Sequence, residues 1–335
     1  MAQIQEQGAK LLGQAAGYIG LRTIELGLRH GLFARIAEHP AGITVEQLAG
    51  DAGLDEFYLG IWARAAYGAE VLDGDGTTYR LAEHVGTLLL DEDSPAFMGA
   101  LFKLLDEPEI FDRFSSVFHS GERTWWDQTS PSWIEGVSGT GRGYYNRLIP
   151  GGLERVPGLQ AKLESGAHVL ELASGVGVGL VKLARAYPRT SIVGVDGDAY
   201  SLELAAKRLN EAELDQRVEL VLSTLEDVDV EGFDVALINI SMHEARDLDK
   251  VAENVRRALA PGGIFVISDF PFPQDHAGFR TVPGRIMLGV QFFEGMIDDQ
   301  LMPTQAFVDL LDKHGYADVG TVEMTPLHTL TFGRR

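Results

Sequence analysis

A glycine-rich loop directly after an apolar run is the feature of this 335-residue sequence with the clearest chemical potential. The run ends at Glu171-Leu172-Ala173, and Gly175 and Gly177 follow before a helical pattern begins. Glycines let the backbone turn tightly and approach a ligand without interference from Cβ, and a helix N-terminus favours an anionic group. A second apolar run ends at Asp196, 21 residues after Gly175, where a carboxylate can accept hydrogen bonds from two ribose hydroxyls. These residues predict a nucleotide site.

The spacing of the glycines narrows the kind of nucleotide. A dinucleotide loop requires Gly-x-Gly-x-x-Gly, or Ala in the last place, and Leu180 occupies that place here. The acidic residue instead precedes the glycines, as Glu171-x-Ala173-x-Gly175-x-Gly177. The dinucleotide interpretation therefore does not fit this loop.

The elements that must position these residues alternate between strand and helix from Gly166 onward. Nearly continuous apolar runs predict strands buried on both faces, over residues 168–173, 191–195, 218–222, 233–240 and 264–268. Helices are predicted over 180–187, 200–209, 247–259 and 304–314, and two closing strands within 317–332. This order predicts an α/β fold with a Rossmann-like, doubly wound sheet.

The first 95 residues have a different, mostly helical pattern. An apolar stripe at helical spacing predicts one buried face, formed by Ile24, Leu28, Leu32, Phe33 and Ile36. Thr44 is a plausible N-cap with Gln47 as its capping-box partner, a second helix is expected over 55–70, and a hairpin over 71–81. Helices followed by a hairpin are the order of a winged-helix module.

Between these halves lies a seam rich in aromatic residues. Its members are Phe97, Phe102, Phe111, Phe114, Phe118, Trp125, Trp126, Trp133, Tyr144 and Tyr145. Aromatic side chains can line a substrate pocket or fill an inter-domain core, and both interpretations stay open. We therefore expect a winged-helix-like domain over 1–95, a helical linker over 96–160 and a ligand-binding domain over 161–335.

Composition excludes several classes of partner. The formal charge of −21 repels phosphate backbones and anionic lipids, so neither nucleic acid nor membrane is expected as the main partner. The absence of cysteine excludes disulfides, thiolate metal sites and a cysteine nucleophile. With neither a membrane-spanning run nor a secretion signal in the pattern, we expect a cytoplasmic protein that acts on small molecules.

The loop with its preceding acid, Asp196 and the strand alternation together resemble the class I S-adenosylmethionine (SAM) methyltransferases. With the helical N-terminus and the aromatic seam in the same order, nearly the whole chain is similar to plant-type O-methyltransferases and their bacterial natural-product relatives. The resemblance implies SAM as cofactor and a homodimer formed through the N-terminal domain. SAM carries an ammonium, which suits a carboxylate, and no phosphate.

The resemblance also implies which residues hold the cofactor. They are Glu171, Ala173, Gly175, Gly177, Asp196, Gly197, Ser223, Thr224, Leu225 and Asn239. Two positions depart from the family pattern. Ala173 stands where glycine is frequent, and the third strand ends without the acid that contacts the adenine side, because Ser223 and Thr224 stand there.

The segment Asn239-Ile240-Ser241-Met242-His243-Glu244 looks like the part of the family that carries the catalytic histidine. His243 is the expected general base, because imidazole titrates near neutral pH. Asp269 corresponds to an acid beside that histidine, and Glu294 is a further candidate, for which Asp298 or Asp299 could substitute.

Tyr144 and Tyr145 lie in the seam just before the predicted cofactor domain. An aromatic face beside a sulfonium gains cation–π stabilisation, so one of the two tyrosines is expected to contact the cofactor or substrate. Packing at a domain boundary is the alternative for both.

These residues favour methyl transfer to a hydroxyl of a small aromatic or polyketide-like acceptor. One alternative is SAM chemistry without methyl transfer, such as cyclisation, hydroxylation or decarboxylation, because a fold does not dictate a reaction. Another is metal-assisted C-methylation of an α-keto acid, which some relatives perform with a metal near this histidine; His243 and Glu294 could supply two ligands, although we expect no metal. A winged-helix regulator is disfavoured, because Arg64 is the only basic residue between Thr44 and Glu70.

Overall fold

The computed structural model describes residues 3–106, 108–124, 134 and 137–335. The chain divides into two compact units, Met1–Glu107 and Pro108–Arg335. The division falls inside the linker expected over 96–160, so the beginning of that segment belongs to the first unit and the remainder to the second. Each unit has a hydrophobic core of its own.

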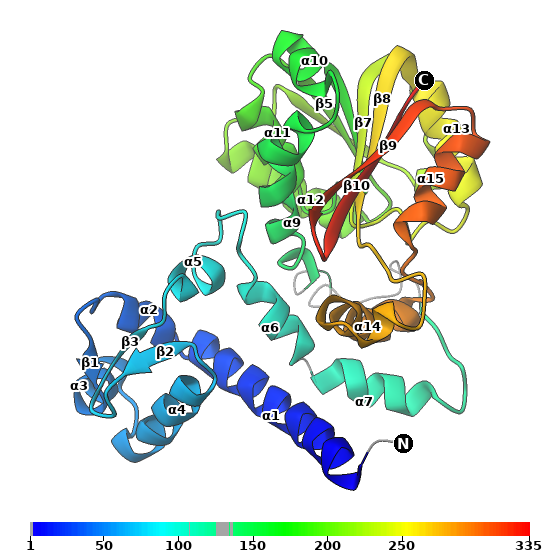
Figure 1. Ribbon diagram of the computed structural model, residues 1–335. Coiled ribbons are helices and arrows are strands. Elements are labelled where there is room, and N and C mark those ends of the chain that lie inside the picture. The colour runs from blue at the N-terminus through cyan, green and yellow to red at the C-terminus, as the bar shows by residue number, and fades with distance from the viewer. Residues whose placement is uncertain (1–2, 107, 125–133, 135–136) are drawn as a thin grey trace. The chain divides into compact units, whose positions relative to one another are not determined.

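The first unit consists of helices and a small sheet (Figure 1). Its helices are α1 (Ile4–Arg29), α2 (Leu32–Ala37), α3 (Val45–Ala52), α4 (Glu56–Gly68), α5 (Val85–Leu89) and α6 (Gly99–Leu105). Its strands pair antiparallel in the order β1 (Ile43–Thr44), β3 (Thr78–Leu81) and β2 (Leu72–Gly74). Strands β2 and β3 form the predicted hairpin, whereas the pattern of the sequence does not indicate β1.

Local signals in the sequence set the ends of these helices. The Gln47 N–H donates to Thr44 Oγ1 at 3.2 Å and the Thr44 N–H donates to Gln47 Oε1 at 3.1 Å, which confirms the predicted capping box. Gly31, with a φ of 63°, separates α1 from α2. The predicted apolar stripe is therefore shared by two helices, and its members pack together in the core of the unit, with Leu28 partly buried.

The second unit is built on a seven-stranded sheet with the order β6-β5-β4-β7-β8-β10-β9. The strands are β4 (His168–Leu172), β5 (Ser191–Asp196), β6 (Val218–Leu222), β7 (Phe233–Asn239), β8 (Leu259–Asp269), β9 (Ala317–Thr325) and β10 (His328–Arg334). Strands β4 to β8 pair in parallel, and β10 pairs antiparallel with both β8 and β9. The predicted parallel strands and the two closing strands are all confirmed.

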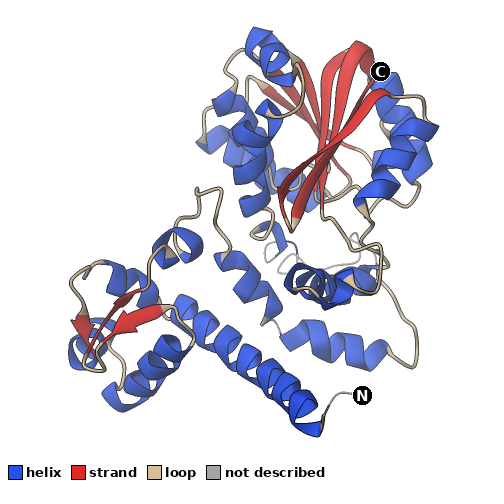
Figure 2. Ribbon diagram, viewed as in Figure 1, coloured by secondary structure: helices blue, strands red, loops and turns tan. Residues whose placement is uncertain are grey.

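Helices cover both faces of this sheet (Figures 1 and 2). The covering helices are α10 (Leu159–Gly166), α11 (Val178–Ala186), α12 (Ala199–Glu211), α13 (Leu248–Ala258) and α15 (Thr304–Lys313). The unit also contains α7 (Pro108–Val117), α9 (Arg142–Arg147), η2 (Leu148–Gly152) and α14 (Val282–Glu294). The second unit has a hydrophobic core on each face of the sheet, and successive residues of β4 point to opposite faces. Val169 packs with α10 and α11, whereas Leu170 packs with α13 and α15. This is the doubly wound arrangement predicted from the sequence.

Two features of the second unit differ from the sequence pattern. Strand β8 begins at Leu259 rather than at Ile264, because the segment before the apolar run also pairs with β7, at Phe233. Helix α14 has no counterpart among the predicted elements. Within the part of the chain that the structure describes, every helix is too short or too polar to cross a lipid bilayer.

Candidate active site

The loop between β4 and α11 adopts left-handed backbone conformations. Ala173, Gly175 and Gly177 have φ angles of 50°, 50° and 78°. Gly177 is the N-cap of α11, and a Cβ there would lie 3.0 Å from Ala205 Cβ on α12. Ala173 adopts a conformation that costs an ordinary residue about 1 kcal/mol, so the glycine that the family resemblance implies here would relieve strain.

Gly179, in the first turn of α11, makes room for two buried side chains. A Cβ at this position would collide with Glu171 Oε1 and with the ring of Tyr145. The residue therefore has to be glycine for Glu171 and Tyr145 to lie against the helix. The sequence alone does not indicate this role of Gly179, because the collision involves a tyrosine distant in sequence.

Glu171 is fully buried at 0% exposure, and neither of its carboxylate oxygens has a hydrogen-bond partner among the described residues. Burial raises the pKa of Glu171 to about 8, an effect that the nearby Tyr145 hydroxyl opposes in part. A buried carboxyl without a partner is unfavourable, so a cationic ligand group would stabilise its ionised form.

Asp196 ends β5 and binds the glycine loop. Its Oδ2 accepts a hydrogen bond from Gly175 N–H at 2.7 Å, and its Oδ1 accepts one from Asp198 N–H at 2.9 Å. Burial raises the pKa of Asp196, and these backbone donors oppose the shift. The carboxylate thus links the ends of the first two parallel strands, and each oxygen keeps a further lone pair.

A pocket of about 330 Å³ lies at the carboxyl ends of these strands, a volume typical of small-molecule sites. Predicted site residues that line it are Tyr145, Ala173, Gly175, Asp196, Gly197, Thr224, Leu225 and Asn239. Predicted residues outside its lining are Tyr144, Glu171, Gly177, Ser223, His243, Asp269 and Glu294. Lining residues that sequence reasoning missed include Ser138, Ser201, Glu226, Ser241, Glu244 and Arg246.

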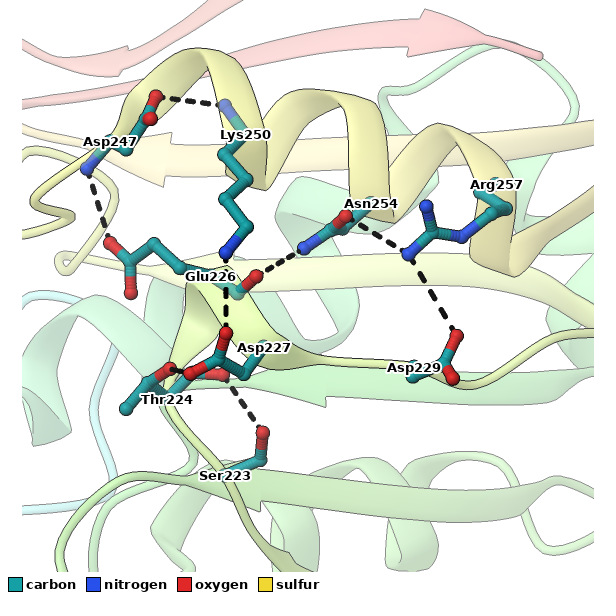
Figure 3. A network of polar contacts seen from close by, with 9 residues as sticks. All are labelled: Ser223, Thr224, Glu226, Asp227, Asp229, Asp247, Lys250, Asn254 and Arg257. Atoms are coloured by element: carbon teal, nitrogen blue, oxygen red, sulfur yellow. Dashed lines mark hydrogen bonds and ion pairs between the residues drawn. The ribbon is translucent and has the colours of Figure 1, made fainter.

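The side of the pocket formed by Thr224, Leu225 and Glu226 is held against α13 by polar contacts (Figure 3). Asn254 Nδ2 donates to the Glu226 carbonyl oxygen at 2.7 Å, and the Asp247 N–H donates to Glu226 Oε1 at 3.2 Å. Thr224 Oγ1 donates to Asp227 Oδ2 at 2.9 Å. Glu226 therefore brings a carboxylate to the side of the pocket where the third strand itself ends without one.

His243 lies between two carboxylates. Its Nδ1 is 2.8 Å from Asp269 Oδ1, and its Nε2 is 3.6 Å from Glu294 Oε2. The histidine side chain is fully buried, and its Nε2 has no hydrogen-bond partner among the described residues. Burial lowers the pKa of His243, but Asp269 and Glu294 outweigh that effect and raise it well above 6.5. The structure thus brings together the three residues predicted as catalytic.

Two further acids extend this group into an acid cluster of Glu244, Asp269, Glu294 and Asp299 around His243. Burial and the neighbouring carboxylates raise the pKa of Glu244 well above 4.5. Burial, followed by Glu294, raises the pKa of Asp299 to about 7. Ligand atoms of His243, Glu244 and Glu294 lie within 4.8 Å of one another, a spacing that could hold a metal ion. Asp298, the other suggested substitute for Glu294, instead pairs with Arg123 at 2.7 Å.

The aromatic residues of the seam have several environments. Tyr145 lines the pocket, whereas the partly buried Tyr144 packs against Phe270 and His328, with ring centroids 5.2 and 4.9 Å away. Phe114 on α7 packs against Phe292 on α14 at 4.7 Å. The predicted pocket-wall residues Trp125, Trp126 and Trp133 lie outside the described residues.

The second unit is similar to known methyltransferases in sequence. Residues 163–287 match the protein family described as Methyltransferase domain. The chain is 30% identical over 134 residues to the ubiquinone/menaquinone biosynthesis C-methyltransferase of Syntrophotalea carbinolica, a match that covers 38% of this chain and 56% of that protein. It is 29% identical over 91 residues to the carboxy-S-adenosyl-L-methionine synthase of Actinobacillus succinogenes, covering 26% and 38%. The chain thus spans between 38% and 56% of the length of these relatives.

Similarity in structure extends over nearly the whole chain. The pyocyanin biosynthetic protein PhzM has a TM-score of 0.74 at 19% identity, with 99% of each chain covered. An O-methyltransferase family protein of Burkholderia thailandensis has a TM-score of 0.71 at 19% identity, covering 100% of this chain and 98% of that one. Human N-acetylserotonin methyltransferase in complex with SAM has a TM-score of 0.70 at 14% identity, covering 100% and 99%.

The fold and the domain match together define the class of the protein. Residues 163–287 of the second unit match the methyltransferase domain family, and the unit has the Rossmann-like fold of class I methyltransferases. Over its full length the chain shares the fold of plant-type and bacterial natural-product methyltransferases, so the resemblance inferred from the glycine loop is confirmed.

Proposed function

We propose that the protein transfers a methyl group from SAM to a hydroxyl of a small aromatic or polyketide-like acceptor, with His243 as the general base. The observation that carries the proposal is the arrangement of His243. Its Nδ1 is fixed by Asp269, and its Nε2 lies 3.6 Å from Glu294 Oε2 without a hydrogen-bond partner among the described residues. Ser241 and Glu244, which are close to His243 in sequence, line the pocket.

The residues of the pocket fit SAM. The buried Glu171 carboxyl, which lies beside the pocket residue Tyr145, suits the ammonium of the methionine end. Asp196, which lines the pocket, suits the ribose hydroxyls. Open backbone at Gly175, where a Cβ would contact nothing, allows close approach of a ligand. Leu225 and Glu226 border the side assigned to adenine. When bound, SAM supplies an electrophilic methyl group on a positively charged sulfur.

The chain would contribute alignment and proton transfer. His243 Nε2 takes the proton of the acceptor hydroxyl while the oxygen forms its bond to the methyl carbon, and Asp269 stabilises the resulting imidazolium through Nδ1–H. Asp269 and Glu294 raise the pKa of His243 well above 6.5. The neutral imidazole, which is the basic form, therefore becomes abundant only at a pH well above 6.5. Most of the rate enhancement would come from alignment of the reacting atoms.

A second candidate is metal-assisted C-methylation of an α-keto acid, which the spacing of His243, Glu244 and Glu294 favours. A divalent cation held there would offset the charge of the buried acids and polarise a carbonyl group. The same Nε2 cannot bind a metal and accept a proton, so the two candidates exclude each other. Metal analysis of protein purified without added salts distinguishes them: about one equivalent per chain, lost in Glu294→Gln, would support the metal and contradict the base.

The homodimer implied by the family resemblance also remains a proposal. Helix α1 exposes large apolar side chains, Ile4, Leu11, Leu12, Tyr18 and Ile19, with 57% to 83% of each accessible. These positions recur at helical spacing, and such an exposed stripe is typical of an interaction surface. We propose that a second copy of the chain covers the exposed stripe of α1. The cytoplasmic location expected from the sequence stays a prediction.

The reaction is tested with SAM labelled with ¹³C in the methyl group. The protein is incubated with a panel of phenols, amines and α-keto acids, and the nucleoside product and the labelled position are identified. We expect S-adenosylhomocysteine in equal amount to a methyl ether. A labelled C–CH₃ product would favour the metal-assisted candidate. Methylthioadenosine would instead indicate cleavage of SAM without methyl transfer. Carboxy-S-adenosyl-L-methionine, the product named for the Actinobacillus succinogenes relative, would indicate carboxylation of SAM itself.

A further inference from the structure

A chain of buried hydrogen bonds leads to the pocket from the opposite side of β8. Arg147 Nε donates to His328 Nδ1 at 3.3 Å, and His328 Nε2 lies 2.7 Å from Ser268 Oγ. Ser268 Oγ in turn donates to Asn239 Oδ1 at 2.6 Å. Ser268 and His328 are 0% exposed and Asn239 is 2% exposed. These four side chains form the Asn239 relay.

The hydrogen bonds of the Asn239 relay all run from Arg147 towards Asn239, because Arg147 can act only as a donor. Arginine can only donate, so His328 Nδ1 must accept and the proton of the imidazole must be on Nε2. His328 stays neutral, because burial and then Arg147 lower its pKa to about 3. Nε2–H therefore donates to Ser268 Oγ, whose only hydrogen is left for Asn239 Oδ1.

This direction determines which way the Asn239 amide faces. Its oxygen is occupied by Ser268, so the nitrogen with its two hydrogens is presented on the other side. Nδ2 is buried and has no hydrogen-bond partner among the described residues, and Asn239 lines the pocket. An amide that was not held could rotate and present its oxygen instead.

The Asn239 amide lies at the same end of the pocket as Glu171. Strands β4 and β7 pair with Glu171 opposite Leu237 and Leu172 opposite Ile238, so Asn239 follows at the same end of the neighbouring strand. Tyr145 lines the pocket together with Asn239, and its ring lies against Glu171 beside Gly179. If Glu171 receives the ammonium of an amino acid, a donor beside it is placed for the carboxylate of the same amino acid. An amide oxygen in that place would repel a carboxylate.

We propose that Ser268 and His328 are positioning residues, which hold the Asn239 amide so that its nitrogen donates to the carboxylate of the bound cofactor. The proposal rests on the proposed function in assigning Asn239 to the methionine end of SAM. Neither Ser268 nor His328 lines the pocket, and both act only through Asn239.

The test uses matched substitutions of His328 and the dissociation constant of S-adenosylhomocysteine, measured by calorimetry. His328→Gln places an amide nitrogen near the position of Nε2 and keeps a donor for Ser268. His328→Asn places its amide near Nδ1 and leaves Ser268 without a donor. The two variants are similar in polarity and size, so we expect similar values of Tm in thermal unfolding. Only His328→Asn disrupts the relay.

We expect Ser268→Ala and His328→Asn each to weaken binding about tenfold, the effect of losing a buried hydrogen bond to a charged group, and His328→Gln to bind within about threefold of the unaltered protein. The double variant Ser268→Ala/His328→Asn is expected to bind no more weakly than Ser268→Ala, because both changes interrupt one chain. Equal losses in His328→Gln and His328→Asn, additive losses in the double variant, or unchanged binding by Ser268→Ala would overturn the relay. An unaltered protein that does not bind S-adenosylhomocysteine would overturn the proposed function instead.

Discussion

The proton carried by Glu171 is expected to govern the pH dependence of cofactor affinity. Burial raises the pKa of Glu171 to about 8, so the free protein holds this carboxyl mostly in its neutral form at pH 7. An ammonium group bound against it favours the ionised form, and binding must then release the proton. Raising the pH removes this proton in advance, so affinity increases with pH.

The magnitude follows from the pKa of about 8. The ionised fraction is about 1% at pH 6, about 10% at pH 7 and about half at pH 8. The dissociation constant of S-adenosylhomocysteine should therefore fall about tenfold from pH 6 to pH 7, about fivefold from pH 7 to pH 8, and little above pH 9.

Calorimetry in two buffers with different ionisation enthalpies measures both the affinity and the protons released. We expect about one proton released per site at pH 6 and almost none at pH 9. Glu171→Gln should weaken binding at high pH and abolish this proton release. Tyr145→Phe should shift the profile to higher pH, because the Tyr145 hydroxyl lowers the pKa of Glu171. Equal affinity from pH 6 to pH 8 without proton release would refute the assignment of Glu171 to the ammonium.

The remaining predictions concern a glycine, the base and the interface. Gly179→Ala should weaken S-adenosylhomocysteine binding at least tenfold in calorimetry, because its Cβ collides with Glu171 and Tyr145. Gly151→Ala, whose Cβ would meet nothing within 4 Å and which is outside the pocket lining, should bind normally. The kcat/KM of the unaltered protein should rise with pH and reach its plateau only well above pH 6.5, the ordinary pKa of histidine. A plateau reached below pH 6.5 would contradict the raised pKa of His243. Leu11→Glu should convert a dimer to monomer in analytical ultracentrifugation, whereas Lys10→Gln, with the same change of charge, should not.

The sheet and the glycine loop could be predicted from the sequence, because their signals are local. Apolar runs mark β4 to β8, and the residues of the loop need backbone angles that glycine supplies. Parallel strands bring their carboxyl ends to one edge, so the nearness of Asp196 to the loop followed from order alone. The capping box at Thr44 was predictable for the same reason.

The acid cluster and the Asn239 relay were not predictable in the same way. Helix α14, which brings Glu294 to His243, has apolar residues on most of its surface and gives no clear periodic signal. Asp299 enters the cluster through the turn that follows, and His328 reaches Ser268 from a strand 60 residues away. Such contacts depend on tertiary packing, and from one sequence the acids were only candidates.

The central claim is that His243 removes the proton of the acceptor hydroxyl. The most direct test compares single-turnover methyl transfer by the unaltered protein and His243→Gln, at saturating SAM, with an acceptor phenol and a more acidic nitro-substituted analogue. We predict a loss of at least a hundredfold for the phenol and a far smaller loss for the analogue, which is already ionised at the pH of the assay. Equal losses for both acceptors, or no loss for either, would contradict the claim.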